Sequence, residues 1–512
     1  MLATSLTAAL LGVEAHLVTV EADSAPGFPR FTMVGLADSA LKESESRIRA
    51  ALRNCGIPFQ WDRRITVNLA PANLRKGGSS FDLATALGLL AADATLVMPQ
   101  LPRVLLVGEL ALDGSLRPVP GVLPMLLLAR RHGLAAAIVP AACSREAALA
   151  PGLAVFPAAT LAEAICLLSA EALPQAPAPV SLGSGSGQSG FDLADVRGQA
   201  LARRALEIAA AGGHNLLLVG PPGSGKTMLA QRLPGILPPL AEAEAVETAA
   251  IHSAAGLSAE EAIVRRPFRC PHHSATGPAL VGGGQRPRPG EVSLAHNGVL
   301  FLDELAEFRR GTLEVLRQPL EEGYVTVARH RGVCRMPARF QLVAALNPCP
   351  CGCAGMPRAA CRCTPGEIRG YLGRLSGPLL DRIDLHVAVP APPFDEIAGP
   401  PGEASGAVRS RVVAARTRQA ERSPSADRSS SSSNALLPPG SLRELVKPGA
   451  EGHRLLRHAV DRLGLSARGL DRILRVARTI SDLADSEDVK AEHLAEALHF
   501  RRSLDDTVLT PL

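Results

Sequence analysis

The sequence predicts an α/β protein built from several domains, and three observations support that prediction. The chain has 512 residues, of which 46% are apolar, and at about 100–200 residues per domain it is long enough for three or more cores. Short β-rich runs alternate with apolar helical stretches along most of its length. Near the middle, at residues 214–230, a buried strand, a glycine-rich loop and a helix follow one another directly.

Composition narrows the range of partners. The net charge of +5 permits a polyanionic partner, but aromatic residues make up only 3% of the chain, so stacking on bases is not expected to be the main mode of nucleic-acid binding. The apolar N-terminus lacks a positive leading segment and is interrupted by Glu14 and His16, which favours a pair of strands over a signal peptide. With no apolar stretch of about twenty residues, we expect a cytoplasmic protein whose ten cysteines are reduced.

Low-complexity segments divide the chain into five parts. Residues 1–170 form an α/β domain of their own, and the Pro-rich, then Gly/Ser-rich stretch 171–190 is a linker. Residues 191–395 form a central α/β domain with a Cys-rich loop at 349–363. Residues 396–440 are a connecting segment with a Ser-rich loop, and residues 441–512 form a small helical domain.

The stretch GPPGSGKT has the pattern of a phosphate-binding loop. Its backbone N–H groups and the helix expected to begin at Lys226 would face the phosphates of ATP, with Lys226 reaching the β- and γ-phosphates and the Thr227 hydroxyl binding Mg²⁺. An ordinary turn is the alternative. The predicted nucleotide-binding residues are Gly220, Pro221, Pro222, Gly223, Ser224, Gly225, Lys226, Thr227 and Asp303.

Two later strands are expected to bring catalytic groups to the same place. GVLFLDEL ends in Asp303, which would hold Mg²⁺, and Glu304, which would polarise the attacking water; a solvated acid pair is the alternative. FQLVAALNP ends in Asn347, which is suited to orienting that water or, alternatively, is a turn residue before Pro348.

These motifs, followed in order by SGPLLDRIDLH and LSARGLDRILRVARTISDLA, resemble those of the Mg-chelatase-related AAA+ proteins, specifically the ComM/YifB group. The resemblance covers nearly the whole chain. It implies a P-loop AAA+ core with a helical lid, and an ATPase ring, usually hexameric, that acts on branched or single-stranded DNA in natural transformation and homologous recombination.

The same resemblance implies roles for two arginines. Arg382 matches the finger arginine that enters the ATP site of the neighbouring subunit, and Arg468 matches the lid arginine that senses the γ-phosphate within its own subunit. Alternatively, Arg382 is a surface residue paired with an adjacent aspartate. Arg374, Arg472 and Arg475 are further candidates.

The first domain resembles the Lon protease domain, a ribosomal S5 domain 2-like fold with a catalytic serine and lysine. Ser79 and Ser80 stand at the start of an expected helix, but Leu123, Pro124 and Met125 occupy the segment where the lysine would lie. A serine without a base is not an activated nucleophile, so we interpret the serines as helix caps and the domain as non-proteolytic, binding or positioning a protein partner.

Cysteines and histidines form two further clusters. Cys349, Cys351, Cys361 and Cys363 could bind Zn²⁺, with Cys353 in reserve, or could be free thiols in a loop. His272 and His273 are assigned a structural or DNA-facing role rather than a metal site, because adjacent side chains on a regular element rarely point the same way.

Residues 321–343 read as a β-hairpin whose turn contains Arg329, His330 and Arg331. The resemblance places this hairpin in the ring's pore, where its arginines would grip DNA phosphates; a solvated turn is the alternative. If the hairpin does not bind DNA, the glycine-rich insert with Arg286 and Arg288 is the next candidate.

Three functions compete. They are an ATP-dependent DNA motor with ATP and Mg²⁺ as cofactors, a chelatase-like ATPase that remodels a protein partner, and a Lon-like protease. The Lon-like first domain and the absence of an integrin-type partner domain favour the motor.

Overall fold

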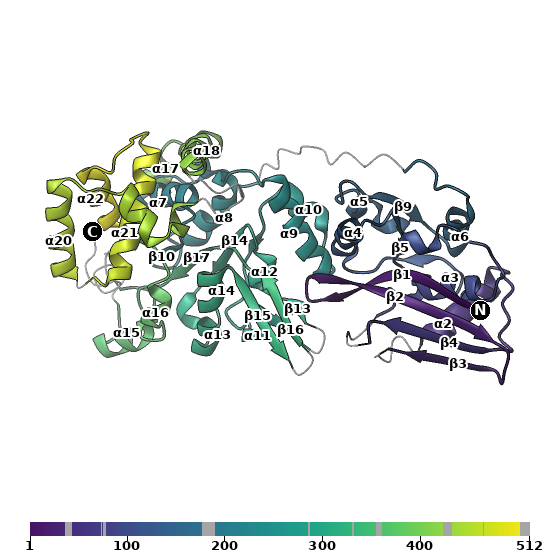
Figure 1. Cartoon of the computed structure of the whole chain (residues 1–512). Helices are drawn as coiled ribbons and strands as arrows, with labels where there is room; N and C mark the ends of the chain where they lie inside the picture. The colour runs from purple at the N-terminus through teal and green to yellow at the C-terminus, as the bar shows by residue number, and fades with distance from the viewer. Residues whose placement is uncertain are drawn as a thin grey trace. The chain divides into compact units, whose positions relative to one another are not determined.

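The structure is a computed structural model of the chain and describes residues 1–35, 43–72, 74, 78–176, 190–284, 287–329, 332–354, 361–422, 433–463 and 465–501. It forms two compact units (Figure 1). Unit 1 comprises Met1–Gly185, Val246–Ile263 and Gln285–Pro289, and unit 2 comprises the rest. The segment Val246–Ile263, which the sequence analysis included in the central domain, therefore groups with unit 1.

Unit 1 is built on a seven-stranded mixed sheet with the order β3-β4-β2-β1-β5-β8-β9. The expected N-terminal strand pair is present, because β1 and β2 run antiparallel from Leu2↔Asp23 to Leu11↔Glu14. The strands are β1 (Leu2–Leu11), β2 (Glu14–Ala25), β3 (Arg30–Val34), β4 (Arg64–Ala70), β5 (Val104–Leu106), β8 (Ala136–Pro140) and β9 (Ala154–Ala158), with a separate pair β6 (Glu109–Leu110) and β7 (Leu116–Arg117).

Helices cover both faces of this sheet, as its alternating side chains require. In β8, Ala136 and Ile138 join one hydrophobic core while Ala137 and Val139 join another, because successive strand residues point to opposite faces. The first core is covered by α2 (Ser44–Asn54), α3 (Asp82–Ala92) and α6 (Leu161–Ser169), and the second by α4 (Val122–Arg131), α5 (Ser144–Ala147), α9 (Glu242–Ala255) and α10 (Ala259–Val264).

Unit 2 is built on a five-stranded sheet with the order β11-β14-β17-β10-β18, and all four strand pairings in that order are parallel. Parallel strands are covered on both faces, and β10 shows this because Leu216 and Leu218 enter one core while Leu217 and Val219 enter the other. The strands are β10 (Leu216–Val219), β11 (Phe268–Arg269), β14 (Val299–Leu302), β17 (Gln341–Leu346) and β18 (Leu385–Ala388).

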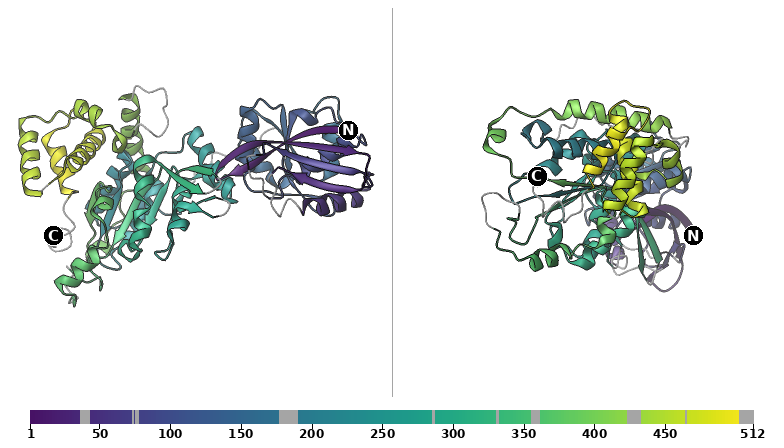
Figure 2. Two further views of the ribbon diagram at one scale, coloured as in Figure 1. Left: turned by 60° about the horizontal axis from the view of Figure 1, so that its bottom comes forward. Right: turned by 90° about the vertical axis from the view of Figure 1, so that its left-hand side faces the viewer.

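The helices of unit 2 divide between the two faces of its sheet and the helical domain. The long ones are α7 (Ala200–Gly212), α8 (Lys226–Ile236), α18 (Ser405–Arg422), α20 (Ala450–Leu463), α21 (Ala467–Leu483) and α22 (Ala491–His499). The shorter elements of unit 2 are α11 (Gly277–Val281), α12 (Glu291–Leu294), α13 (Arg310–Glu314), α14 (Arg317–Glu322), α15 (Pro365–Leu372), α16 (Gly377–Leu380), α17 (Phe394–Ala398), α19 (Pro439–Leu445), β12 (Gly282–Gly283), β15 (Tyr324–Arg329) and β16 (Gly332–Pro337), whereas β13 (Arg288–Pro289) falls in a range that groups with unit 1. Figure 2 shows the three C-terminal helices together at one end of unit 2.

The predicted α/β class is confirmed, and so are the strands before the phosphate loop, the acid pair and Asn347. Helix α18 was not predicted, because residues 396–440 were interpreted as a connecting segment. Its arginine-rich sequence hides an apolar stripe in which Val408, Val412 and Ala415 recur at helical spacing and are buried. No helix in the described part of the chain has both the length and the apolar character needed to cross a membrane.

Candidate active site and its surroundings

The phosphate loop follows β10 and turns back through glycines that no other residue could replace easily. Gly223 and Gly225 have φ values of +76° and +88°, a region that favours glycine. A Cβ at Gly220 would lie 2.0 Å from the Val389 carbonyl oxygen. Helix α8 begins at Lys226, as predicted, so the loop presents its N–H groups and a helix N-terminus to one point.

Lys226 is held inside this loop. Its Nζ donates to the carbonyl oxygens of Gly220 (2.7 Å) and Pro221 (2.9 Å) and to Asn347 Oδ1 (3.1 Å). Burial lowers the pKa of Lys226, although the charges of Asp303 and Glu304 act in the opposite direction. Lys226 and Asn347 are thus brought together by the parallel pairing of β10 with β17.

Two oxygen groups suited to Mg²⁺ meet beside the loop. Thr227 Oγ1 donates to Asp303 Oδ2 over 2.8 Å, and the other carboxylate oxygen accepts from the Glu304 backbone N–H at 2.9 Å. Mg²⁺ in phosphoryl-transfer sites takes few protein oxygens and completes its octahedron with water and phosphate. The Thr227 hydroxyl and the Asp303 carboxylate fit that ion.

Glu304 has a contact that the sequence analysis missed. Its backbone is left-handed, with φ of 52°, and its half-exposed carboxylate lies 3.1 Å from Nδ1 of His273. The ring of His273 is 4.1 Å from that of His272, so the expectation that adjacent histidines point apart is wrong here: they follow β11 in an irregular loop. The sequence carries one signal of this contact, the polar segment with His272 and His273 directly after β11. The structure adds that β11 pairs with β14, the strand that ends before the acid pair.

An apolar cavity of about 210 Å³ lies next to the loop and was not foreseen. Its lining includes Gln199, Ala200, Val389 and Pro390, and the Gln199 side-chain amide donates to the Ser224 carbonyl in the phosphate loop. A flat apolar group attached to the phosphates could occupy this space.

The predicted arginines lie at the other edge of the sheet. A cavity of about 870 Å³ with a mixed polar and apolar lining is bordered by Asn215 and Gln341, at the amino ends of β10 and β17, and by Arg382 and Arg468. The phosphate loop follows the carboxyl end of β10, and the first and last residues of this four-residue strand are roughly 10 Å apart. Arg468, near the N-terminal end of α21, thus lies beside the amino ends of these strands in this structure, and its implied role as the γ-phosphate sensor stays a prediction.

Arg382 is only 8% exposed, and its guanidinium pairs with Glu321 and the Pro378 carbonyl. It is paired, but not with the adjacent Asp381 or Asp384.

The three further candidate arginines also have partners in this structure. Arg374 donates to Ala306 O, Arg475 donates to Leu437 O, and Arg472 lies 3.7 Å from Asp384. Although burial alone would raise it, the pKa of Asp384 is lowered by the hydrogen bond with His214 and by the charges of His214, Arg472 and Arg501.

Unit 1 contains the two serines, but not as helix caps. Helix α3 begins at Asp82 with Phe81 at the N-cap and no side-chain cap, so the capping interpretation is wrong. Ser79 lies too far before the helix and donates its hydroxyl to Glu109 instead. The segment Leu123 to Met125 is buried in α4 and provides no lysine.

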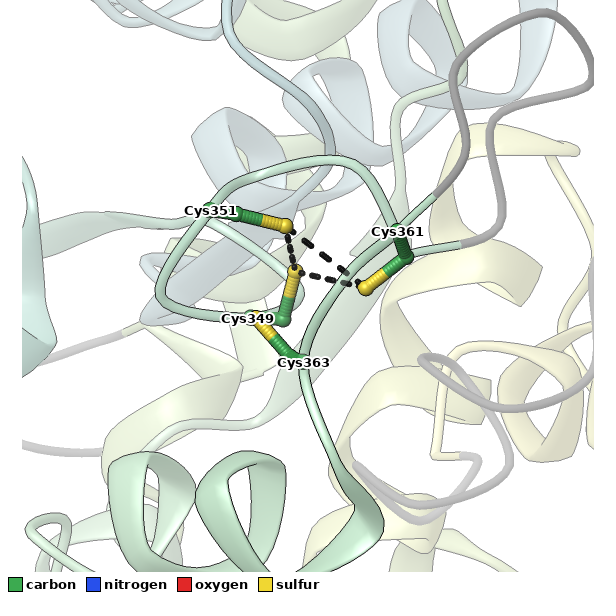
Figure 3. A group of neighbouring side chains, drawn as sticks. All are labelled: Cys349, Cys351, Cys361 and Cys363. Atoms are coloured by element: carbon green, nitrogen blue, oxygen red, sulfur yellow. Dashed lines mark hydrogen bonds between the residues drawn. The ribbon is translucent and has the colours of Figure 1, made fainter.

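The four predicted cysteines converge in unit 2 (Figure 3). The Sγ atoms of Cys349, Cys351, Cys361 and Cys363 all lie within 4.8 Å of one another, whereas Cys353 Sγ turns toward the Cys351 carbonyl oxygen at 3.5 Å. Backbone N–H groups of Cys353 and Arg362 and the thiol of Cys349 contribute to lowering the pKa of Cys351 to about 6.

The predicted hairpin is present as β15 and β16, paired from Tyr324↔Pro337 to Arg329↔Gly332. His330, Arg331 and the side chain of Arg329 lie outside the described residues, as does Arg286. The described Arg288 is exposed, and Arg335 stacks on Tyr324 at 3.4 Å.

Comparison with known proteins agrees with this architecture. Family models described as "Magnesium chelatase, subunit ChlI", "Subunit ChlI of Mg-chelatase" and "Magnesium chelatase, subunit ChlI C-terminal" match residues 192–397, 20–143 and 402–501. The chain is 45% identical to Competence protein ComM of Haemophilus influenzae, over 96% of each chain, and 45% identical to the uncharacterized protein YifB of Escherichia coli, over 97% of this chain and 96% of that one. A Lon protease of Salinispora arenicola is 31% identical over 26% of this chain and 18% of its own length.

Proposed function

The chain belongs to the Mg-chelatase-like AAA+ family, in the group of ComM and YifB, and from that premise we propose that it is an ATP-dependent DNA motor, a hexameric branch-migration helicase of natural transformation and homologous recombination. The observation that carries the proposal is the 45% identity over 96% of both chains to a relative named a competence protein. Membership of the family implies ATPase activity and the use of ATP and Mg²⁺.

The geometry at the carboxyl edge of the unit 2 sheet supports ATP hydrolysis. In the proposed reaction Lys226 exchanges its carbonyl partners for β- and γ-phosphate oxygens. Thr227 and Asp303 would hold Mg²⁺, which would supply positive charge beside the phosphates. Glu304 accepts a proton from the attacking water, and Asn347, one hydrogen bond from Lys226, orients that water. The apolar cavity beside Gln199 would take the base.

A ring is favoured by the arginines at the opposite edge. Arg382 and Arg468 line a cavity at the amino ends of the strands, whereas the phosphate loop follows the carboxyl end of β10, and this placement supports contact with the nucleotide of a neighbouring subunit. A planar guanidinium suits the phosphoryl oxygens of the transition state. We therefore propose that both arginines act between subunits, and that the ring is the active form.

DNA is the proposed substrate, branched or single-stranded, and we propose that it is gripped by the β15–β16 hairpin through Arg329, His330 and Arg331. Contacts to phosphates would make binding independent of sequence and sensitive to salt. We further propose that the protein works in the cytoplasm and has no membrane partner. Unit 1 is proposed to be non-proteolytic and to bind a protein partner. The four-cysteine cluster is proposed to bind Zn²⁺.

Branch migration on a mobile four-way junction tests the proposal directly. The purified chain should separate the junction in the presence of ATP and Mg²⁺, and its Glu304→Gln variant should not. Forked DNA should also accelerate ATP turnover. Turnover that is indifferent to DNA, with no junction separation, would contradict the motor and point to a protein client.

A further inference from the structure

The cysteine cluster joins two stretches of chain, one that directly follows Asn347 and one that leads into α15. Cys349 and Cys351 follow β17, and Cys361 and Cys363 precede α15 (Figure 3). The Sγ separations are 3.4 Å for Cys349 and Cys351, 3.7 Å for Cys349 and Cys361, and 3.6 Å for Cys351 and Cys361.

These separations fit one tetrahedral metal ion. A Zn–S distance of about 2.3 Å at tetrahedral angles places neighbouring sulfurs about 3.8 Å apart. A disulfide would need about 2.05 Å. The donor set, four thiolates and no oxygen, selects zinc over Mg²⁺ or Ca²⁺. A backbone N–H also reaches the cluster, since Ala354 donates to Cys349 Sγ at 3.3 Å.

The first pair of cysteines is continuous with the ATP site. Cys349 is fully buried and stands two residues after Asn347. Between Cys351 and Cys353, Gly352 takes a φ of +78° and packs so closely on the phosphate loop that a Cβ would lie 2.6 Å from Pro222 Cδ. The loop that carries the cluster is therefore braced against the loop that cradles phosphate.

The second pair leads to the acid segment. Two residues after Cys363, α15 begins at Pro365, and beyond its end Arg374 donates to Ala306 O and to Glu307, each at 3.2 Å. Ala306 and Glu307 directly follow Glu304 and Leu305 in sequence. The cluster thus links the Asn347 loop, the phosphate loop and the segment after the catalytic acid.

We propose that Cys349, Cys351, Cys361 and Cys363 hold one zinc ion that positions the ATP site, by clamping the loop after Asn347 against Pro222 and tying it to α15. The positioning role rests on the ATPase function proposed above, whereas the metal site does not. Without the ion, the loop after Asn347 would no longer be fixed by the cluster, so the position of Asn347 would be less restrained. Lys226 would keep its hydrogen bonds to the phosphate-loop carbonyls. Turnover should suffer more than nucleotide binding.

Metal content tests the site itself. The full chain and its Cys353→Ser variant should co-purify with stoichiometric zinc, and the Cys361→Ser/Cys363→Ser variant should lose it. Cys353→Ser is the matched control because its thiol lies in the same loop but outside the cluster. Elemental analysis that finds iron, or no metal in the unsubstituted chain, would overturn the assignment, whatever the ATPase activity proves to be.

Kinetics tests the positioning role. In the Cys361→Ser/Cys363→Ser variant we expect kcat to fall about 10-fold or more while nucleotide affinity, which also reports folding, changes by less than about threefold. In an Asn347→Ala background the same substitutions should cost less than about twofold more, because both changes act on one group. Unchanged kcat in the metal-free variant, or a full independent loss on top of Asn347→Ala, would refute positioning; an unsubstituted chain without ATPase activity would instead refute the proposed function.

Discussion

Nδ1 of His273 lies 3.1 Å from a carboxylate oxygen of Glu304, the acid expected to polarise the attacking water. The two side chains come from the loop after β11 and the end of β14, neighbours in the parallel sheet. Because Glu304 is half exposed, this contact places His273 to set the orientation of its carboxylate.

Replacing His273 by Ala should therefore lower kcat roughly tenfold, about the cost of losing an orienting hydrogen bond, and leave nucleotide affinity unchanged. His273→Asn keeps a donor near the Nδ1 position and should recover part of the loss. His272→Ala is the control, because Nδ1 of that ring bonds to Ser274 instead. Steady-state ATPase assays decide, and an undiminished rate in His273→Ala would show that this contact does not orient the acid.

Lys226 and Glu304 should separate binding from hydrolysis. Lys226→Ala removes the cation that meets the phosphates in the ground state, so nucleotide binding should be lost. Glu304→Gln should bind nucleotide normally and lower kcat by about 100-fold or more, the usual contribution of a general base. Fluorescent-nucleotide titration beside ATPase assays measures both, and an equal loss of binding in the two variants contradicts the assignments.

Arg382→Ala should remove turnover, by about 1,000-fold if it acts as a finger, while each subunit still binds nucleotide. Its partner Glu321 is half exposed, so the remaining charge stays hydrated and the fold should survive. Mixing this variant with Lys226→Ala protein should restore some ATPase activity, since the Lys226→Ala subunits carry an intact Arg382. Absence of rescue at every mixing ratio argues against action between subunits.

Glu146 in unit 1 should destabilise the fold at neutral pH. Burial raises its pKa, although hydrogen bonds from Ser253 and the Leu123 N–H act in the opposite direction. An acid whose pKa is higher in the folded state costs stability above that pKa, and the cost disappears as the pH falls below the unfolded value.

Glu146→Gln keeps an acceptor for both donors and removes the charge. It should stabilise unit 1 by on the order of 1 kcal/mol at pH 7.5 and by nothing near pH 3.5. Calorimetric unfolding across this pH range measures the difference, and a difference that does not depend on pH would exclude a titration of Glu146.

The chemistry of the ATP site was predictable because local sequence determines it. The Leu216–Val219 strand, the helix start at Lys226 and the Asp303–Glu304 pair lie in short stretches whose residue types permit few other structures. The hairpin was predictable from the turn residues between its two β-runs. The four cysteines were predicted to gather from two C-x-C pairs, a spacing that left free thiols as an alternative.

What the sequence could not supply depends on long-range packing. His273 reaches Glu304 only because β11 pairs with β14. Arg468 shares a cavity with Asn215 and Gln341, which are far from it in sequence. The assignment of Val246–Ile263 to unit 1 is similar, since Ala249 and Ala259 fill a core made by α4 and the sheet of that unit. No local pattern records such pairings.

The hairpin β15–β16 provides the test of DNA binding. Two arginines from the turn of each subunit would contact DNA phosphates, and several subunits would do so at once. Each phosphate contact that is lost should reduce the slope of log affinity against log salt by about 1. Arg329→Ala combined with Arg331→Ala should therefore weaken binding equally for all sequences and flatten its salt dependence, with ATP binding and ring assembly intact. Arg335→Ala is the matched control, because this arginine lies on the same hairpin but stacks on Tyr324. If the double variant keeps both its DNA affinity and its DNA-stimulated ATPase activity, the hairpin does not grip DNA, and the insert with Arg286 and Arg288 becomes the surface to test.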